Sequence, residues 1–216
     1  MNRGWYNYSM EHKLASKGIK TKIPFKGVYS KGMNKIEFVE FDKLPKYLYH
    51  ATPTENVINI LEKGLDVGKE ETRSLEYEWD SYRPVDNTIF FVDKPKLAGY
   101  FGFQAVQSVA KRKGEEFTAD KLDYTILRIN TKEFEKHNFV TYLGAELFGK
   151  GDREYFVKYK VPRFWIDGGT RIYYDIKKAD VITETYDIKW DRTKFELIPK
   201  KVKKWKDGMV IKRGIV

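Results

Sequence analysis

Short runs of apolar and aromatic residues, separated by polar stretches, predict a chain rich in β-strands. In some runs apolar and polar residues alternate, as on a half-buried strand, and in others the apolar residues are continuous. The runs that predict strands are residues 47–51, 88–92, 123–130, 154–161, 170–176 and 180–186. Pro162 directly follows the fourth run and should end it.

The first predicted strand is followed at once by the pattern of a helix over residues 52–63. Thr52 and Glu55 have the spacing of a capping box, and Pro53 would occupy the first helical position. Gly64 suits a left-handed helix stop. The apolar face of this helix would be formed by Val57, Ile58 and Leu61.

A second helix is predicted after residue 93. Asp93 is a candidate cap, and the residues that recur at helical spacing are Leu97, Tyr100, Phe101, Gln104 and Val109. Between the two helices, residues 66–87 are polar and acidic and predict a long surface loop. These elements together predict an α+β fold, a mixed sheet with a few short helices.

Composition excludes several kinds of site. The chain has 216 residues, no Cys and three His. A disulfide framework, a thiolate zinc site and a cysteine nucleophile are therefore impossible, and a histidine-rich metal site is not expected. No apolar run approaches the roughly 20 residues that a membrane-spanning helix needs, and the N-terminus lacks the apolar core of a signal peptide. We expect a soluble, cytoplasmic protein with no membrane partner.

The net charge of +10 lies at the two ends of the chain. Residues 1–35 carry a net charge of +7, residues 189–216 carry +7, and residues 36–188 carry about −4. This distribution predicts a basic N-terminal extension, a central domain and a basic C-terminal segment. The ends also hold the aromatic residues Trp5, Tyr6, Tyr8, Trp190 and Trp205. Such ends could bind a polyanion through lysines and stacking rings, or could simply be solvated.

Three short motifs stand on the predicted strands or just after them. Residues 48–52 read Leu-Tyr-His-Ala-Thr and are followed by Lys-Gly-Leu at 63–65. Residues 89–92 read Ile-Phe-Phe-Val and precede Ala-Gly-Tyr at 98–100, and Glu154 opens a later strand. In this order the motifs resemble the His-Tyr-Glu branch of the ADP-ribosyltransferase superfamily, which includes diphtheria-toxin-like and PARP-like enzymes. The resemblance implies that family's split mixed β-sheet as the core of residues 36–188.

The resemblance also implies a role for each matching residue, with NAD as the substrate. His50 would hydrogen-bond the adenosine-side ribose, and Ala51 would hold the nicotinamide carboxamide through its backbone. Thr52 and Phe90 would line the same site, and Tyr100 would stack on the nicotinamide ring. Glu154 would stabilise the positive charge that grows on the ribose as the glycosidic bond breaks, a reaction that needs no metal.

The chain departs from the family pattern at three positions. Phe90 stands where the triad tyrosine is expected, so a hydroxyl contact would be lost. Ala51 replaces a commoner glycine, and Asp152 stands where a longer Glu or Gln often contacts the acceptor. Each matching residue also has a purely structural interpretation: His50 could be a satisfied strand residue, Tyr100 a core aromatic, and Glu154 a surface carboxylate paired with Lys158 or Arg163.

The resulting hypothesis is a mono-ADP-ribosyltransferase that modifies a macromolecule. The basic ends favour a nucleic acid or a nucleic-acid-bound protein as acceptor, and residues 154–166 also resemble DarT-like enzymes that modify nucleobases. The resemblance further suggests a toxin or a phage effector. The alternatives are an NAD glycohydrolase, a non-catalytic nucleic-acid-binding domain with a decayed transferase fold, and, with less support, an NAD-dependent RNA 2′-phosphotransferase.

Overall fold

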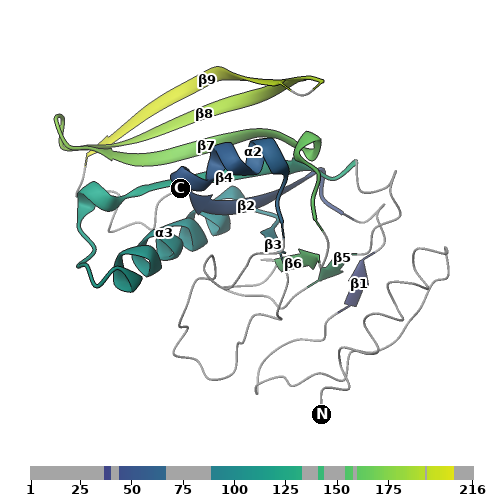
Figure 1. The fold of residues 1–216 in the computed structure, drawn as a ribbon, viewed down its shortest axis with the longest axis horizontal. Coiled ribbons are helices and arrows are strands. Elements are labelled where there is room, and N and C mark those ends of the chain that lie inside the picture. The colour runs from purple at the N-terminus through teal and green to yellow at the C-terminus, as the bar shows by residue number, and fades with distance from the viewer. Residues whose placement is uncertain are drawn as a thin grey trace, which may run out of the picture.

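The fold is built around one antiparallel β-sheet (Figure 1). The computed structural model describes residues 37–39, 44–66, 89–132, 141–143, 154–157, 160–192 and 194–206. In this part of the chain nine strands pair in the order β1-β5-β6-β3-β2-β4-β7-β8-β9. Their bounds are β1 Glu37–Val39, β2 Tyr47–Pro53, β3 Ile89–Val92, β4 Asp123–Asn130, β5 Thr141–Leu143, β6 Glu154–Val157, β7 Ile166–Asp175, β8 Asp180–Asp191 and β9 Lys194–Lys206.

The sheet falls into two groups of strands that meet at one residue pair. The helices and strands confirm the α+β class. Every strand pairing in the described ranges is antiparallel, so the mixed sheet that we expected is wrong for this part of the chain. Strands β2 and β4 are in register over the full length of β2. Strands β2 and β3, by contrast, share only the pair Tyr49 and Val92. The group β1-β5-β6-β3 therefore diverges from the group that begins with β2.

The first helix starts later than the sequence predicts. Strand β2 extends through Pro53, a 3₁₀ turn η2 covers Thr54–Asn56, and α2 runs from Val57 to Lys63. The predicted capping box is wrong, because the N-cap is Asn56 and makes no side-chain capping bond. Strand pairing with β4 holds the backbone of residues 52 and 53 extended and so outweighs the local helix signal.

Helix α2 ends at Gly64, as the sequence predicts, but with ψ of 171° this glycine lies outside the left-handed helical region, and the buried face of α2 also differs from the predicted one. Gly64 has φ of +89°, as a glycine stop requires, and a Cβ there would lie 2.5 Å from the carbonyl oxygen of Val161. Ile58 is 52% exposed, whereas Ile60 is buried with the rest of the helix's apolar face. Leu65 forms an isolated bridge with Val161, so Val161 belongs to this bridge and not to β6.

The second helix, α3, spans Pro95–Arg112 and is capped differently from the prediction. Its N-cap is Lys94, not Asp93, and Pro95 is the first helical residue, where a missing N–H costs nothing. Two further 3₁₀ turns are η4 at Ala119–Lys121 and η5 at Arg163–Trp165. No helix in the described ranges is both long and apolar enough to cross a membrane.

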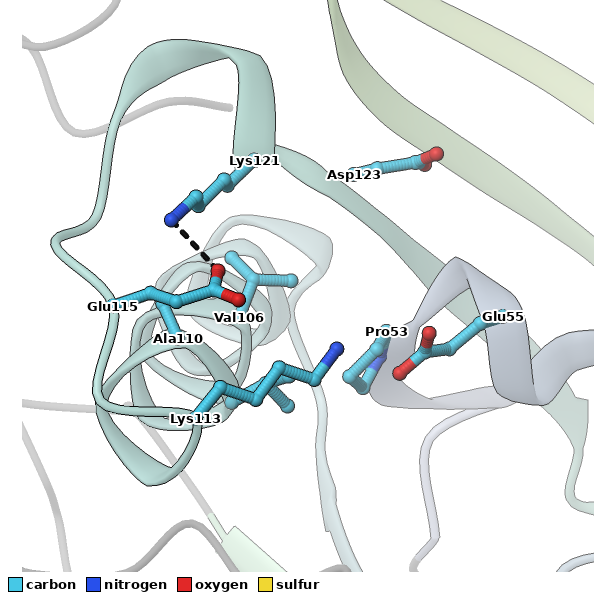
Figure 2. A pocket seen from close by; sticks show the side chains of 9 residues that line it. Pro53, Glu55, Val106, Ala110, Lys113, Glu115, Lys121 and Asp123 are labelled. Atoms are coloured by element: carbon cyan, nitrogen blue, oxygen red, sulfur yellow. Dashed lines mark ion pairs between the residues drawn. The ribbon is translucent and has the colours of Figure 1, made fainter.

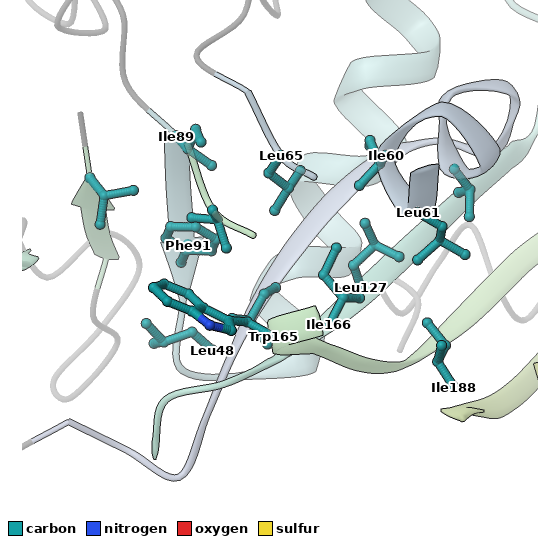
Figure 3. Packing of buried hydrophobic residues seen from close by; sticks show 14 of the residues in the cluster. Leu48, Ile60, Leu61, Leu65, Ile89, Phe91, Leu127, Trp165, Ile166 and Ile188 are labelled. Carbon is teal, nitrogen blue, oxygen red and sulfur yellow. The ribbon is translucent and has the colours of Figure 1, made fainter. Parts of the chain in front are cut away.

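The two faces of the sheet carry separate hydrophobic clusters. On one face, α2 packs on residues of β2, β3, β4 and β6, together with Trp165 and Ile166 (Figure 3). On the other face, α3 packs on Val92, Tyr124, Ile126 and Ile172. Strand β4 serves both clusters: Leu127 and Ile129 point to the α2 face, and Tyr124 and Ile126 to the α3 face. This alternation fixes the register of β4, since a slip by one residue would exchange the two faces.

The C-terminal strands are longer than predicted and continue the same sheet. Strand β8 crosses the boundary drawn at residue 188, and β9, for which no strand is predicted, pairs with it over its whole length. Residues 1–35, residues 67–87 of the loop predicted at 66–87, and residues 207–216 lie outside the described residues.

Candidate active site

His50 lies in the middle of β2 and is tied to the neighbouring strand β3. Its Nδ1 is 2.9 Å from the carbonyl oxygen of Phe90. Its ring is half-buried and meets the Phe91 ring edge-on, with 6.0 Å between centroids. The hydrogen bond forms just beyond the Tyr49–Val92 pair, where β2 and β3 diverge and the ladder between them ends.

This hydrogen bond determines which nitrogen of His50 carries the proton. A carbonyl oxygen only accepts hydrogen bonds, so Nδ1 must carry a hydrogen and donate it. Burial lowers the pKa of His50, and the bond to Phe90 opposes that effect only in part. At neutral pH the ring is therefore neutral, with Nε2 unprotonated. An unprotonated Nε2 is an acceptor, and a hydroxyl group is a suitable donor for it.

The two residues after His50 are held by the fold. Ala51 is half-buried, pairs with Ile126 of β4 and contacts the hydrophobic cluster under α3. Thr52 is only 6% exposed, and its hydroxyl accepts a 3.3 Å hydrogen bond from the side-chain amide of Asn56. Thr52 thus connects the end of β2 to the turn that follows. Its hydroxyl makes this side-chain hydrogen bond and does not provide the helix cap that the sequence predicts.

Phe90 and Glu154 lie on paired strands next to β2. Phe90 is half-buried on β3, where it pairs with Phe156 of β6. Glu154 is the first residue of β6 and pairs with Val92, which in turn pairs with Tyr49. The backbone at residue 154 is thus two strands away from the residue that precedes His50. Asp152 lies outside the described residues.

Tyr100 lies on the exposed side of α3. Its side chain is 41% exposed, its hydroxyl accepts a 2.6 Å hydrogen bond from Gln104, and its ring meets Phe101 edge-on at 5.6 Å. The interpretation of Tyr100 as a core aromatic is therefore wrong. Both of these contacts of Tyr100 are with residues of its own helix.

A charged cluster that the sequence did not reveal adjoins Tyr49. Arg128 of β4 pairs with Tyr49 and donates to Asp167 at 2.6 Å and to Asp187 at 3.0 Å. Its guanidinium also lies over the ring of Tyr47, 4.9 Å from the centroid. The two carboxylates outweigh the effect of burial and hold the pKa of Arg128 above its usual value. The only sequence signal was a basic residue within an apolar strand.

Gly168 of β7 makes room for this cluster. A Cβ on Gly168 would come 2.8 Å from Nη2 of Arg128 and 2.8 Å from the carbonyl oxygen of Tyr186. Any other residue would therefore displace the guanidinium or the neighbouring strand.

A small cavity lies apart from these residues. It has a volume of about 190 Å³ and is bounded by the end of β2, the turn η2, the second half of α3 and the segment that leads into β4 (Figure 2). Its charged lining includes Lys121, which is paired with Glu115 at 2.8 Å. Neither His50 nor Tyr100 lines it, so the cavity does not coincide with the candidate site. Nowhere in the described ranges do three potential metal ligands cluster.

The chain matches no protein-family model and no protein in the curated collection of sequences.

Proposed function

We propose that the protein is a mono-ADP-ribosyltransferase, which cleaves NAD and transfers ADP-ribose to a macromolecular acceptor. The observation that carries the proposal is the hydrogen bond from Nδ1 of His50 to the carbonyl oxygen of Phe90. It leaves Nε2 of a neutral, half-buried ring as an acceptor for a ribose hydroxyl of NAD. This is the role that the resemblance to the superfamily implies for His50.

The order of the strands supports the same proposal. The segments that carry the three motifs are far apart in the sequence, yet β6, β3 and β2 are consecutive in the sheet. A substrate bound near the divergence of β2 and β3 would therefore lie close to the backbone of all three strands. The divergence also supports a split sheet like that of the superfamily, which we propose for this chain with antiparallel pairing among its described strands.

The proposed reaction assigns different tasks to the site residues. The bond between C1 of the nicotinamide ribose and the pyridinium nitrogen breaks, and its electron pair leaves with nicotinamide. Glu154 would stabilise the resulting positive charge on the ribose, an interaction that strengthens in the transition state. An acceptor oxygen or nitrogen then forms a bond to C1 and loses a proton to solvent.

Three other residues would bind NAD without taking part in bond breaking. The backbone of Ala51 would hold the nicotinamide carboxamide, and the exposed ring of Tyr100 would stack on the nicotinamide. Phe90 would add apolar contact but no hydrogen bond. Asp152 would contact the acceptor, for which we propose a nucleic acid or a nucleic-acid-bound protein.

The test is incubation of the protein with NAD labelled in its adenylate phosphate and with whole-cell extract. We expect label on a macromolecule, sensitive to nuclease or to protease, and loss of that label with Glu154→Gln. Glu62→Gln, which changes an exposed glutamate of α2, serves as the matched control and should transfer label normally.

The other outcomes of this experiment are equally informative. Label that is recovered only as free ADP-ribose would identify an NAD glycohydrolase. No nicotinamide release and no NAD binding would overturn the proposal and favour a domain with a decayed transferase fold.

A further inference from the structure

The outermost strand of the sheet, β9, carries an exposed row of positive charge. Strand β9 pairs with β8 alone among the described strands, so one of its edges is unpaired there (Figure 1). Five of its lysines are exposed, against one glutamate, Glu196. These lysines are Lys194, Lys200, Lys201, Lys203 and Lys204. Lysines on an edge strand discourage pairing with another protein strand, which argues against a second copy of the chain as the partner.

Most of this charge is not neutralised within the described part of the chain. Lys200 forms an ion pair with Asp187 at 3.0 Å, so it belongs to the cluster around Arg128. Lys194, Lys201 and Lys204 have no ion pair with any described residue, and Lys203 contacts an aromatic ring. The strand therefore offers several ammonium groups to an anionic partner.

An exposed tryptophan lies in the same row. Successive residues of a strand point to opposite faces, so Lys201, Lys203 and Trp205 share one face. Trp205 is 37% exposed, and its indole N–H donates to the hydroxyl of Thr183 on β8 at 3.2 Å. The ammonium of Lys203 lies 5.4 Å from the centre of its ring. A fixed ring beside an ammonium can contact a base and its phosphate together.

Trp190, the other tryptophan of the basic C-terminal segment, contacts residues inside the fold. The indole N–H of Trp190 donates to the carbonyl oxygen of Ile166 at 2.8 Å. Its ring is packed between Phe164 and Phe195, with centroid distances of 5.3 Å and 5.6 Å. The stacking role that the sequence suggested for both residues is therefore open only to Trp205.

We propose that the face of β9 formed by Lys201, Lys203 and Trp205 binds single-stranded nucleic acid. The lysines attract the phosphates, and the tryptophan requires bases that are not paired in a duplex. Binding at this face does not depend on NAD chemistry.

The test measures the fluorescence anisotropy of a labelled 20-nucleotide oligo-dT with the full-length protein over a range of KCl concentrations. Lys201→Glu combined with Lys203→Glu should weaken binding at least tenfold and flatten the dependence of log K on log salt, as expected when two phosphate contacts are lost. The matched control combines Lys63→Glu and Lys132→Glu, which makes the same change in net charge at exposed positions away from β9.

Variants of Trp205 test stacking separately from charge. Trp205→Ala should weaken binding about tenfold, and Trp205→Phe much less, because phenylalanine still stacks. Equal losses in the β9 and control double variants, or an equal affinity for duplex DNA, would overturn the inference. Glu154→Gln should bind the oligonucleotide normally, and the β9 variants should release nicotinamide normally without nucleic acid. Failure of one proposal is thus distinguishable from failure of the other.

Discussion

Gly102 of α3 lies directly against the ring of Tyr124 on β4: a Cβ at residue 102 would come 2.3 Å from Cδ2 and 2.6 Å from Cε2 of that ring. The helix can approach the sheet this closely only because residue 102 has no side chain. Since Tyr124 is fully buried, its ring has no free space into which it could move.

We therefore expect Gly102→Ala to destabilise the protein by about 1–3 kcal/mol, although alanine is the better helix former. Urea unfolding followed by circular dichroism measures the effect. Ser108→Ala, on the same helix at a half-buried position, is the control and should leave stability unchanged or slightly raised. Equal stability of the Gly102→Ala variant and the wild type would contradict this packing.

The hydroxyl of Tyr124 is buried without a hydrogen-bond partner among the described residues. Burial raises the pKa of Tyr124, which is consistent with an unsolvated hydroxyl. Because an unsatisfied polar group opposes folding, Tyr124→Phe should raise the free energy of unfolding by roughly 1 kcal/mol. The midpoint of urea unfolding is the measurement. A loss of stability would mean that the hydroxyl is bonded to a residue outside the described ranges.

The lowered pKa of His50 makes stability depend on pH. The unfolded chain gains a proton on this residue below about pH 6.5, while the folded chain still lacks it. The free energy of unfolding should therefore have its full value above that pH and should decrease as the pH falls towards the folded-state pKa of His50. The loss amounts to about 1.4 kcal/mol for each tenfold difference in proton affinity between the two states.

Urea unfolding at pH 7.5 and pH 5.5 measures this dependence. His50→Asn places an amide N–H at the position of Nδ1, so it can still donate to the carbonyl oxygen of Phe90 but does not titrate, and its stability should change less between the two pH values. The other two histidines are common to both proteins and cancel in the comparison. Parallel pH dependences would show that His50 is not the titrating group.

Phe90 offers a test of the proposed site by gain of function. Phe90→Tyr supplies, at a half-buried position, the hydroxyl that the proposed function implies there, and one new hydrogen bond to NAD should raise kcat/KM for nicotinamide release by about twofold to tenfold. Phe156→Tyr, the same change at the paired position on β6, is the control. A lower kcat/KM for Phe90→Tyr would argue against NAD binding beside β3.

The sequence alone determined several elements through local chemistry. The apolar run that contains Phe90 and the alternating run at residues 123–130 predicted β3 and β4 as strands from local pattern alone. The half-buried strand that the alternation predicted is wrong, because β4 is buried on both faces. The glycine that ends α2 was equally readable, since the positive φ at Gly64 is a property of that residue type.

Tertiary contacts decided what local patterns could not. Pairing with β4 draws Thr52 and Pro53 into β2 against a strong helix signal, and antiparallel pairing with β8 makes an edge strand of the lysine-rich segment around Lys201. The bond between His50 and the carbonyl oxygen of Phe90 joins residues 40 positions apart. Such contacts depend on which strands become neighbours in the sheet. Strand pairing is determined by the burial of whole sheet faces, which no short segment of sequence specifies.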